Sequence, residues 1–145
     1  MNRTPYMIAL TMIAALLLSI PSYASADGAA YERQISPDFD AHKTAYDPKH
    51  TPKVTAPDTV KKGEWFDVTI EIGQGARHPS LVEHHVRWIG LYKGEVELVR
   101  AYMHPVHSSP KVTFTIRLEE DATLRALEEP THTTAWITEH KVTVE

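Results

Sequence analysis

The chain has 145 residues, of which 42% are hydrophobic and 23% charged, and it contains three Trp, six Tyr and three Phe. This composition is typical of a globular domain with a buried core, and it argues against a disordered chain. The absence of cysteine excludes disulfides, thiolate metal sites, a catalytic Cys and a lipid-modified Cys. The formal net charge of −4 disfavours nucleic acid and anionic membranes as partners. Nine histidines are the unusual feature.

The first 26 residues have the three regions of a secretory signal peptide. Arg3 supplies a positive start, an apolar run of 14 residues extends over 7–20, and Ala24-Ser25-Ala26 is a small-residue cleavage pattern. The apolar run is shorter than the roughly 20 residues that a membrane-spanning helix needs. We therefore expect cleavage after Ala26, which removes one Arg, changes the net charge from −4 to −5 and leaves 119 residues. The sequence predicts a soluble periplasmic protein with no membrane contact after cleavage.

The rest of the chain reads as a flexible N-terminal extension, 27–47, followed by one domain, 48–145. The extension is polar and has no hydrophobic period. In the domain, apolar and polar residues alternate with period two, most clearly over 65–72 and 111–119, as in strands with one buried face. Gly and Pro breakers separate these runs at a spacing of about ten residues. The pattern predicts an all-β fold, an immunoglobulin-like antiparallel β-sandwich of about seven strands.

Most of the histidines fall at the expected ends of strands, where the loops of a sandwich present ligands. These residues are His50, His78, His84, His85, His104, His107 and His132. Neutral imidazole is the commonest metal-binding side chain, although a single loop histidine is more often solvated or hydrogen-bonded. Because neighbours in a strand point to opposite faces, only one of His84 and His85 can face a shared site, and the pattern leaves the choice open. We expect His42 and His140 to be solvated.

The segment from Arg77 to Tyr92, RHPSLVEHHVRWIGLY, resembles the iron-binding domain of superoxide reductases, the neelaredoxin and desulfoferrodoxin family. In that family a His-Pro pair is followed by a second His six positions after the first, and then by a strand of the pattern aliphatic-x-aromatic-Ile. The segment Lys49-His50-Thr51-Pro52 is similar to the family's Lys-His-x-Pro element. The resemblance covers most of residues 48–145 and implies the family's β-fold.

The resemblance also implies a mononuclear, non-haem ferrous iron site. In the family, four His bind iron in one plane and a Cys thiolate binds from below, opposite an open position for superoxide. His50, His78 and His84 match three of the four His positions.

The fourth His and the Cys of the family come from a Cys-x-x-His segment that precedes Gly-x-Trp, where this chain reads EEPTHTTAW over 128–136. If His132 matches the family's His, Glu129 takes the Cys position and one residue is inserted. If Trp136 is matched instead, Pro130 takes the Cys position and Thr133 that of the His. We favour the first match because it keeps a ligand. The expected metal ligands are therefore His50, His78, His84, His132 and Glu129.

The missing thiolate affects both the metal and the activity. A carboxylate is a harder and weaker electron donor than a thiolate, so superoxide reductase turnover does not follow from the resemblance alone. Imidazoles without a thiolate also suit Cu(II), which makes copper the alternative metal and a non-enzymatic metal-binding protein the alternative function. Lys49 matches the family's lysine that attracts the anion, and it is the expected catalytic residue for superoxide or another small anion.

The resemblance further implies an electron-donor protein, and for a periplasmic protein we expect a c-type cytochrome rather than the rubredoxin used in the family. Family members often form homo-oligomers.

A second, shorter resemblance concerns residues 102–110, YMHPVHSSP. They are similar to the corresponding stretch of the Z subunit of the Sox thiosulfate-oxidation carrier, a periplasmic binding partner without metal chemistry. This implies a sulfur-carrier interaction module as another alternative. Met103, His104 and His107 would also suit a surface copper site, although such a triplet is more often an ordinary turn.

Overall fold

The structure is a computed structural model that describes residues 42–145. The predicted signal peptide, 1–26, and residues 27–41 of the predicted extension lie outside this range. The described strands are β1 (His42–Lys43), β2 (Pro52–Thr55), β3 (Thr59–Val60), β4 (Trp65–Ile72), β5 (Val86–Lys93), β6 (Val96–Tyr102), β7 (Lys111–Arg117), β8 (Ala122–Pro130) and β9 (Ala135–Val144). The prediction of an all-β fold is confirmed. Between residues 42 and 145 no helix has the length and hydropathy needed to cross a membrane.

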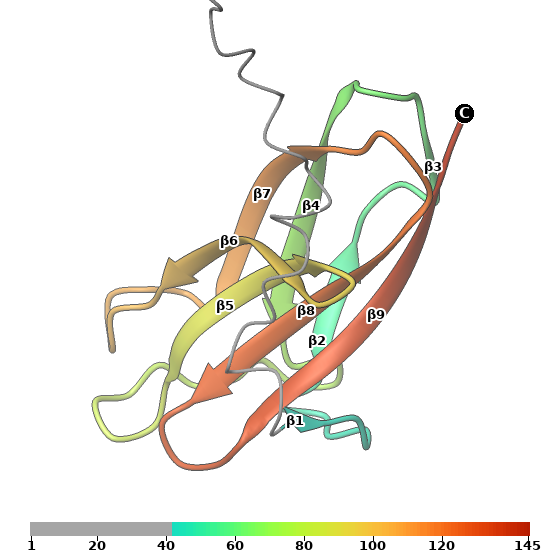
Figure 1. The fold of residues 1–145 in the computed structure, drawn as a ribbon. Coiled ribbons are helices and arrows are strands. Elements are labelled where there is room, and N and C mark those ends of the chain that lie inside the picture. The colour runs from blue at the N-terminus through green and yellow to red at the C-terminus, as the bar shows by residue number, and fades with distance from the viewer. Residues whose placement is uncertain (1–41) are drawn as a thin grey trace, which may run out of the picture.

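Two sheets pack face to face (Figure 1). The larger sheet has the order β1-β9-β8-β5-β6, with β3 also paired to β9, and the smaller sheet has the order β2-β4-β7. Neighbouring strands are antiparallel except β1 and β3, which run parallel to β9. Strand β1 falls within the segment 27–47 that the sequence analysis assigns to a flexible extension, and its backbone is paired with β9.

The period-two pattern of β4 explains how the two sheets meet. Val68, Ile70 and Ile72 are fully buried, while the residues between them are partly exposed. They belong to one core cluster with Ile89 of β5 and Leu124 of β8, which come from the other sheet. Each such side chain contributes roughly 1.5–3 kcal/mol by leaving water, so this apolar layer holds the sheets together.

The strand register brings several loops to one end of the sandwich. Pro52 at the start of β2 pairs with Ile72 at the end of β4, and Val86 at the start of β5 pairs with Pro130 at the end of β8. The β4–β5 loop and the β8–β9 turn therefore lie at the end where β1 is found, opposite the C-terminus (Figure 1). The histidine-bearing segments before β2, before β5 and before β9 converge there.

Candidate metal centre

Four histidines from three segments form one cluster at this end of the sandwich. Measured between ring centroids, His50 lies 4.9 Å from His78 and 5.0 Å from His132. His84 lies 5.0 Å from His78 and 3.9 Å from His132. Possible ligand atoms of His50, His78 and His132 all lie within 4.8 Å of one another. The structure thus brings together the four histidines that the sequence analysis proposes as ligands.

The turn before β2 fixes the position of His50. The carboxylate of Asp47 accepts hydrogen bonds from the backbone N–H groups of Lys49 (2.8 Å) and His50 (3.0 Å). The bond from Lys49 has the largest effect on the pKa of the Asp47 carboxyl, and together with the bond from His50 it holds that pKa below its ordinary value. The hydroxyl of Thr51 accepts a bond from the Asp47 N–H at 2.8 Å, and the Thr51 N–H returns one to the Asp47 carbonyl at 3.0 Å. His50 is therefore held on a closed turn rather than on a free loop.

The same turn is bonded to the loop that carries His78. The Gly75 and Ala76 N–H groups donate to the Pro48 carbonyl at 3.0 and 2.8 Å, and the Gly73 N–H donates to the Thr51 carbonyl at 3.2 Å. The N–H of His78 donates to the carbonyl of Ile72 at 3.1 Å. Backbone bonds thus set the separation between the His50 and His78 segments.

Replacing Gly73 by Ala is expected to disturb both segments. Gly73 has φ +96°, and a Cβ there would lie 2.1 Å from the Ala76 carbonyl oxygen and 3.0 Å from that of Lys49. Because these are backbone atoms, the loop must move, and we expect a loss of more than about 1 kcal/mol of stability together with weaker metal binding. Gly94→Ala is the matched control, since Gly94 also has a positive φ but an open surrounding. Urea denaturation and metal titration that found the two variants equivalent would contradict this role.

The ring nitrogens of the cluster are arranged as lone-pair donors. Nδ1 of His78 lies 2.8 Å from the Pro79 carbonyl, which only accepts, so Nδ1 carries the proton and Nε2 is left with its lone pair. Nε2 of His78 and Nε2 of His84 are buried and have no hydrogen-bond partner. Buried polar atoms are nearly always satisfied, so orphaned nitrogens facing one cluster indicate a missing ligand.

Burial also keeps these imidazoles in the metal-binding form. It lowers the pKa of His78 to about 4 and lowers the pKa values of His50 and His132 below the ordinary 6.5. The three rings are neutral at pH 7, as metal coordination requires. The donor set therefore fits a divalent cation that accepts imidazole, such as iron or copper.

The structure separates His84 from His85. Nδ1 of His85 lies 3.1 Å from the carbonyl of Leu81, outside the cluster, whereas His84 is packed on His132. Both residues precede β5, which begins at Val86. Leu81 and His84 exchange backbone hydrogen bonds of 2.9 and 3.2 Å, and this tight turn directs the two adjacent side chains differently.

Glu129, which the sequence analysis matches to the missing Cys, is not among the described residues whose possible ligand atoms converge. Its carboxylate lies 3.2 Å from the guanidinium of Arg87. Glu128, one residue earlier, is fully buried, and its Oε1 lies 3.6 Å from Nδ1 of His50. Successive residues of a strand point to opposite faces, so only one of the two glutamates in β8 can face inward. Burial raises the pKa of Glu128 to about 9.

Trp136 and Lys43 are site residues that the sequence analysis does not identify. The indole of Trp136 stacks on His50, with centroids 4.2 Å apart and planes 13° from parallel. The ammonium of Lys43 lies 4.3 Å from the centroid of Trp136 and donates to the Thr133 hydroxyl at 3.1 Å. Lys43 comes from the segment expected to be flexible, and only its pairing with β9 brings it to the site.

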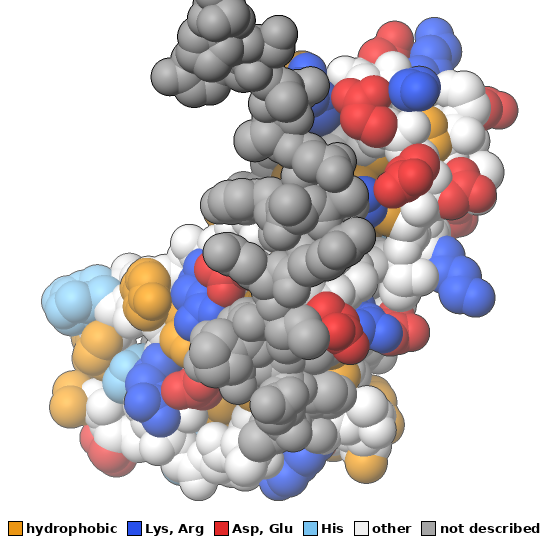
Figure 2. Space-filling view, in the orientation of Figure 1, with side chains coloured by type: hydrophobic (Ala, Val, Ile, Leu, Met, Phe, Trp, Pro, Cys, Tyr) orange, Lys and Arg blue, Asp and Glu red, His pale blue; other side chains and the backbone are white. Residues whose placement is uncertain are grey.

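The remaining candidate residues are not members of the buried cluster. Lys49 is exposed on the turn before His50. His104 and His107 are exposed on the β6–β7 loop with centroids 5.0 Å apart, where Figure 2 shows pale-blue side chains at the left-hand end of the molecule. Met103 packs against the core cluster rather than standing with them on the surface. His140 lies 3.3 Å from the Pro57 carbonyl and 3.4 Å from the Asp58 carboxylate.

Comparisons with known proteins point to one family. The family model described as desulfoferrodoxin matches residues 42–139. A "Putative superoxide reductase" of Thermotoga maritima is 30% identical over 115 residues, covering 67% of this chain and 88% of that protein. The neelaredoxin of Megalodesulfovibrio gigas is 41% identical over 44 residues, covering 30% and 34% respectively.

Solved structures agree with the sequence relatives. The superoxide reductase (neelaredoxin) from Ignicoccus hospitalis has a TM-score of 0.61 and 33% identity, covering 66% of this chain and 81% of that one. The structure described as a putative superoxide reductase from Thermotoga maritima has a TM-score of 0.64 and 30% identity, covering 73% and 96%.

Proposed function

Because this chain belongs to the desulfoferrodoxin family, we propose that it is a periplasmic superoxide reductase that holds one non-haem iron ion with His50, His78, His84 and His132. The observation that carries the proposal is the convergence of the four rings at one end of the sandwich. The donor atoms support it as well, since the buried Nε2 atoms of His78 and His84 have no hydrogen-bond partner.

The cluster has a closed side and an open side. His50 and His78 are 8% and 1% exposed, whereas His132 is exposed, so a small anion would approach beside His132. Iron bound here would deliver one electron to superoxide, which takes up two protons and leaves as hydrogen peroxide. The chain's own residues bind and orient the ion, and an external donor protein, for which we propose a c-type cytochrome, restores the electron.

Pulse radiolysis of the ferrous-loaded protein tests the activity. We expect the ferrous form to be oxidised at a rate proportional to the superoxide concentration, with formation of hydrogen peroxide. The His78→Ala variant, treated identically, should show only the spontaneous decay of superoxide. Loaded wild-type protein that leaves that decay unchanged would refute turnover.

A second candidate function is copper binding without turnover. The specific observation in its favour is the donor set, since the chain has no cysteine and the cluster offers imidazole nitrogen. Cu(II) binds most nitrogen-donor sites more tightly than Fe(II) does. The metal found in protein taken from the periplasm distinguishes the two candidates.

Two lysines near the cluster supply positive charge for an anion. Lys49 precedes His50 on its turn, and Lys43 lies over Trp136. We expect Lys49→Ala and Lys43→Ala each to lower the second-order rate constant with superoxide several-fold at low salt, because a nearby cation steers a small anion. The effect should shrink as ionic strength rises toward about 0.15 M.

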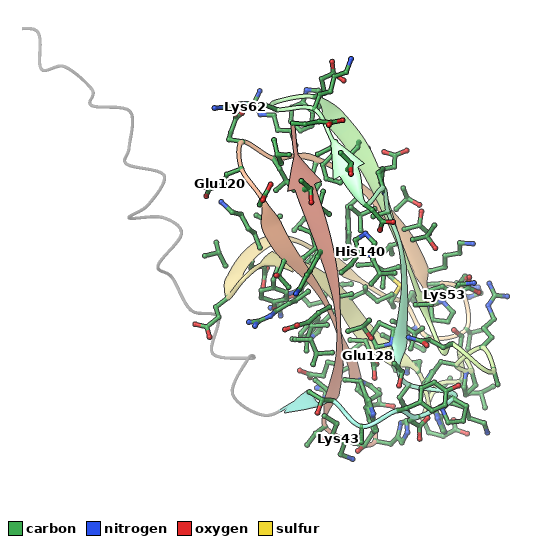
Figure 3. The ribbon with its side chains drawn as sticks, turned by 90° about the vertical axis from the view of Figure 1, so that its right-hand side faces the viewer. Lys43, Lys53, Lys62, Glu120, Glu128 and His140 are labelled. Atoms are coloured by element: carbon green, nitrogen blue, oxygen red, sulfur yellow. The ribbon has the colours of Figure 1, made fainter. Side chains whose placement is uncertain are left out.

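Lys62→Ala is the control for these lysine variants. Figure 3 shows Lys62 at the end of the sandwich opposite Lys43, and its removal changes the net charge by the same amount. A loss of rate in Lys62→Ala equal to that in the other two would assign the effect to net charge rather than to local steering.

A further inference from the structure

A buried carboxyl lies beside His50 of the histidine cluster and is not explained by the fold. Glu128 is fully buried, and it is the one acidic residue among the buried residues of the range 42–145. Neither of its carboxyl oxygens has a hydrogen-bond partner. A buried carboxyl without a partner is costly, and a core position in β8 would be more stable with an apolar residue. The stability of the fold does not explain a glutamate at this position, so we looked for a role of Glu128 at the histidine cluster.

The nearest ring nitrogen to this carboxyl belongs to His50. Oε1 of Glu128 lies 3.6 Å from Nδ1 of His50, and that nitrogen is buried and also lacks a partner. The separation exceeds the usual hydrogen-bond length of about 2.7–3.2 Å by only a few tenths of an ångström. Nδ1 of His50 and Oε1 of Glu128, a possible donor and an acceptor, thus lie near each other and have no other partner.

Trp136 restricts His50 from a second direction. Glu128 and Trp136 are register partners on β8 and β9, so their side chains lie side by side on the inward face of the sheet. The indole stacks on the His50 ring and sets its plane. With the plane set by Trp136, a hydrogen bond at Nδ1 fixes which nitrogen of His50 remains for a metal.

We propose that Glu128 is the positioning residue of the metal site: in the metal-bound protein its carboxylate accepts a hydrogen bond from Nδ1–H of His50, so that His50 presents Nε2 to the metal. The inference rests on the proposed function. Carboxylates that hold metal-binding histidines in this way set the tautomer and raise the basicity of the ligand. When a divalent ion is bound, its positive charge favours the ionised carboxylate of Glu128, which adds one negative charge to a site of neutral imidazoles.

The experiment compares wild type with Glu128→Gln, Glu128→Leu and Glu129→Gln. Fe(II) and Co(II) affinities of each full-length mature protein are measured anaerobically by competition with a chelator. We expect Glu128→Gln, which loses the charge but keeps an acceptor, and Glu128→Leu, which loses both, to bind about 10–100-fold more weakly. Glu129→Gln, the matched control at the partly exposed neighbour that pairs with Arg87, should bind within about twofold of wild type.

A spectroscopic readout separates this role from a general effect on folding. In Zn(II)-loaded protein with 15N-labelled histidine, NMR should show Nδ1 of His50 protonated and Nε2 coordinated. Coordination through Nδ1, or unchanged affinity in both Glu128 variants, would overturn the proposal even if the wild type binds metal. A wild-type protein that binds neither Fe(II), Co(II) nor Zn(II) would overturn both this proposal and the proposed function.

Discussion

Replacing His78 by Ala is expected to lower the affinity for Fe(II) or Co(II) at least about 100-fold, because a ligand lost from a metal site costs more than the 10–100-fold of an outer-shell partner. His78 is the most buried histidine of the cluster, its Nδ1 is tied to the Pro79 carbonyl, and its Nε2 is left without a partner. The measurement is a competition titration on purified mature protein.

His104→Ala is the control for that variant, since His104 is an exposed histidine outside the cluster. It should keep wild-type affinity. Circular dichroism and urea denaturation of His78→Ala check that the fold persists, because loss of a buried ring also leaves a cavity. A folded His78→Ala protein with undiminished affinity would remove His78 from the site.

Replacing Glu128 by Gln is expected to change how the stability of the metal-free protein depends on pH. Burial raises the pKa of Glu128 to about 9, against an ordinary value of 4.5. Between these values the native carboxyl keeps a proton that the unfolded chain has lost, so the contribution of Glu128 is complete below pH 4.5 and is lost as pH rises toward 9. A glutamine side chain stays neutral at every pH, so the Glu128→Gln variant does not lose this stability as pH rises.

The Gln variant should therefore gain stability relative to wild type as pH rises from 5 to 8.5, by an amount on the order of a few kcal/mol. His78 acts in the opposite sense, because its pKa of about 4 makes stability fall as pH drops below 6.5. Both proteins share that effect, so it cancels in the difference. Urea denaturation in the presence of a chelator measures the difference in unfolding free energy between the variant and wild type. For the control Glu129→Gln we expect this difference to stay constant with pH. The same constancy in Glu128→Gln would contradict the buried state of Glu128.

The sequence carries enough information to predict the sandwich and the four histidines. The alternation over residues 65–72 becomes β4, with its apolar residues in the core. The resemblance to the family's motifs selects His50, His78 and His84, and these are three of the four rings that the loops bring together.

Other features depend on tertiary structure that no local pattern contains. Glu128 and Glu129 are adjacent and chemically identical, and only the register of β8 against β9 determines which of them faces inward. Lys43 lies in a polar, aperiodic stretch, and its place beside Trp136 follows from pairing between segments about 90 residues apart. The missing Cys of the matched motif does not indicate that Glu128 lies beside His50.

The central claim is tested most directly by the metal content of mature, untagged protein purified from the periplasm, with His78→Ala purified beside it. We expect about one iron ion per chain in wild type and none in the variant, as for a site whose ligands are the clustered histidines. Wild-type protein that contains no metal and takes up none when Fe(II) is added would contradict the assignment of this cluster as a metal centre.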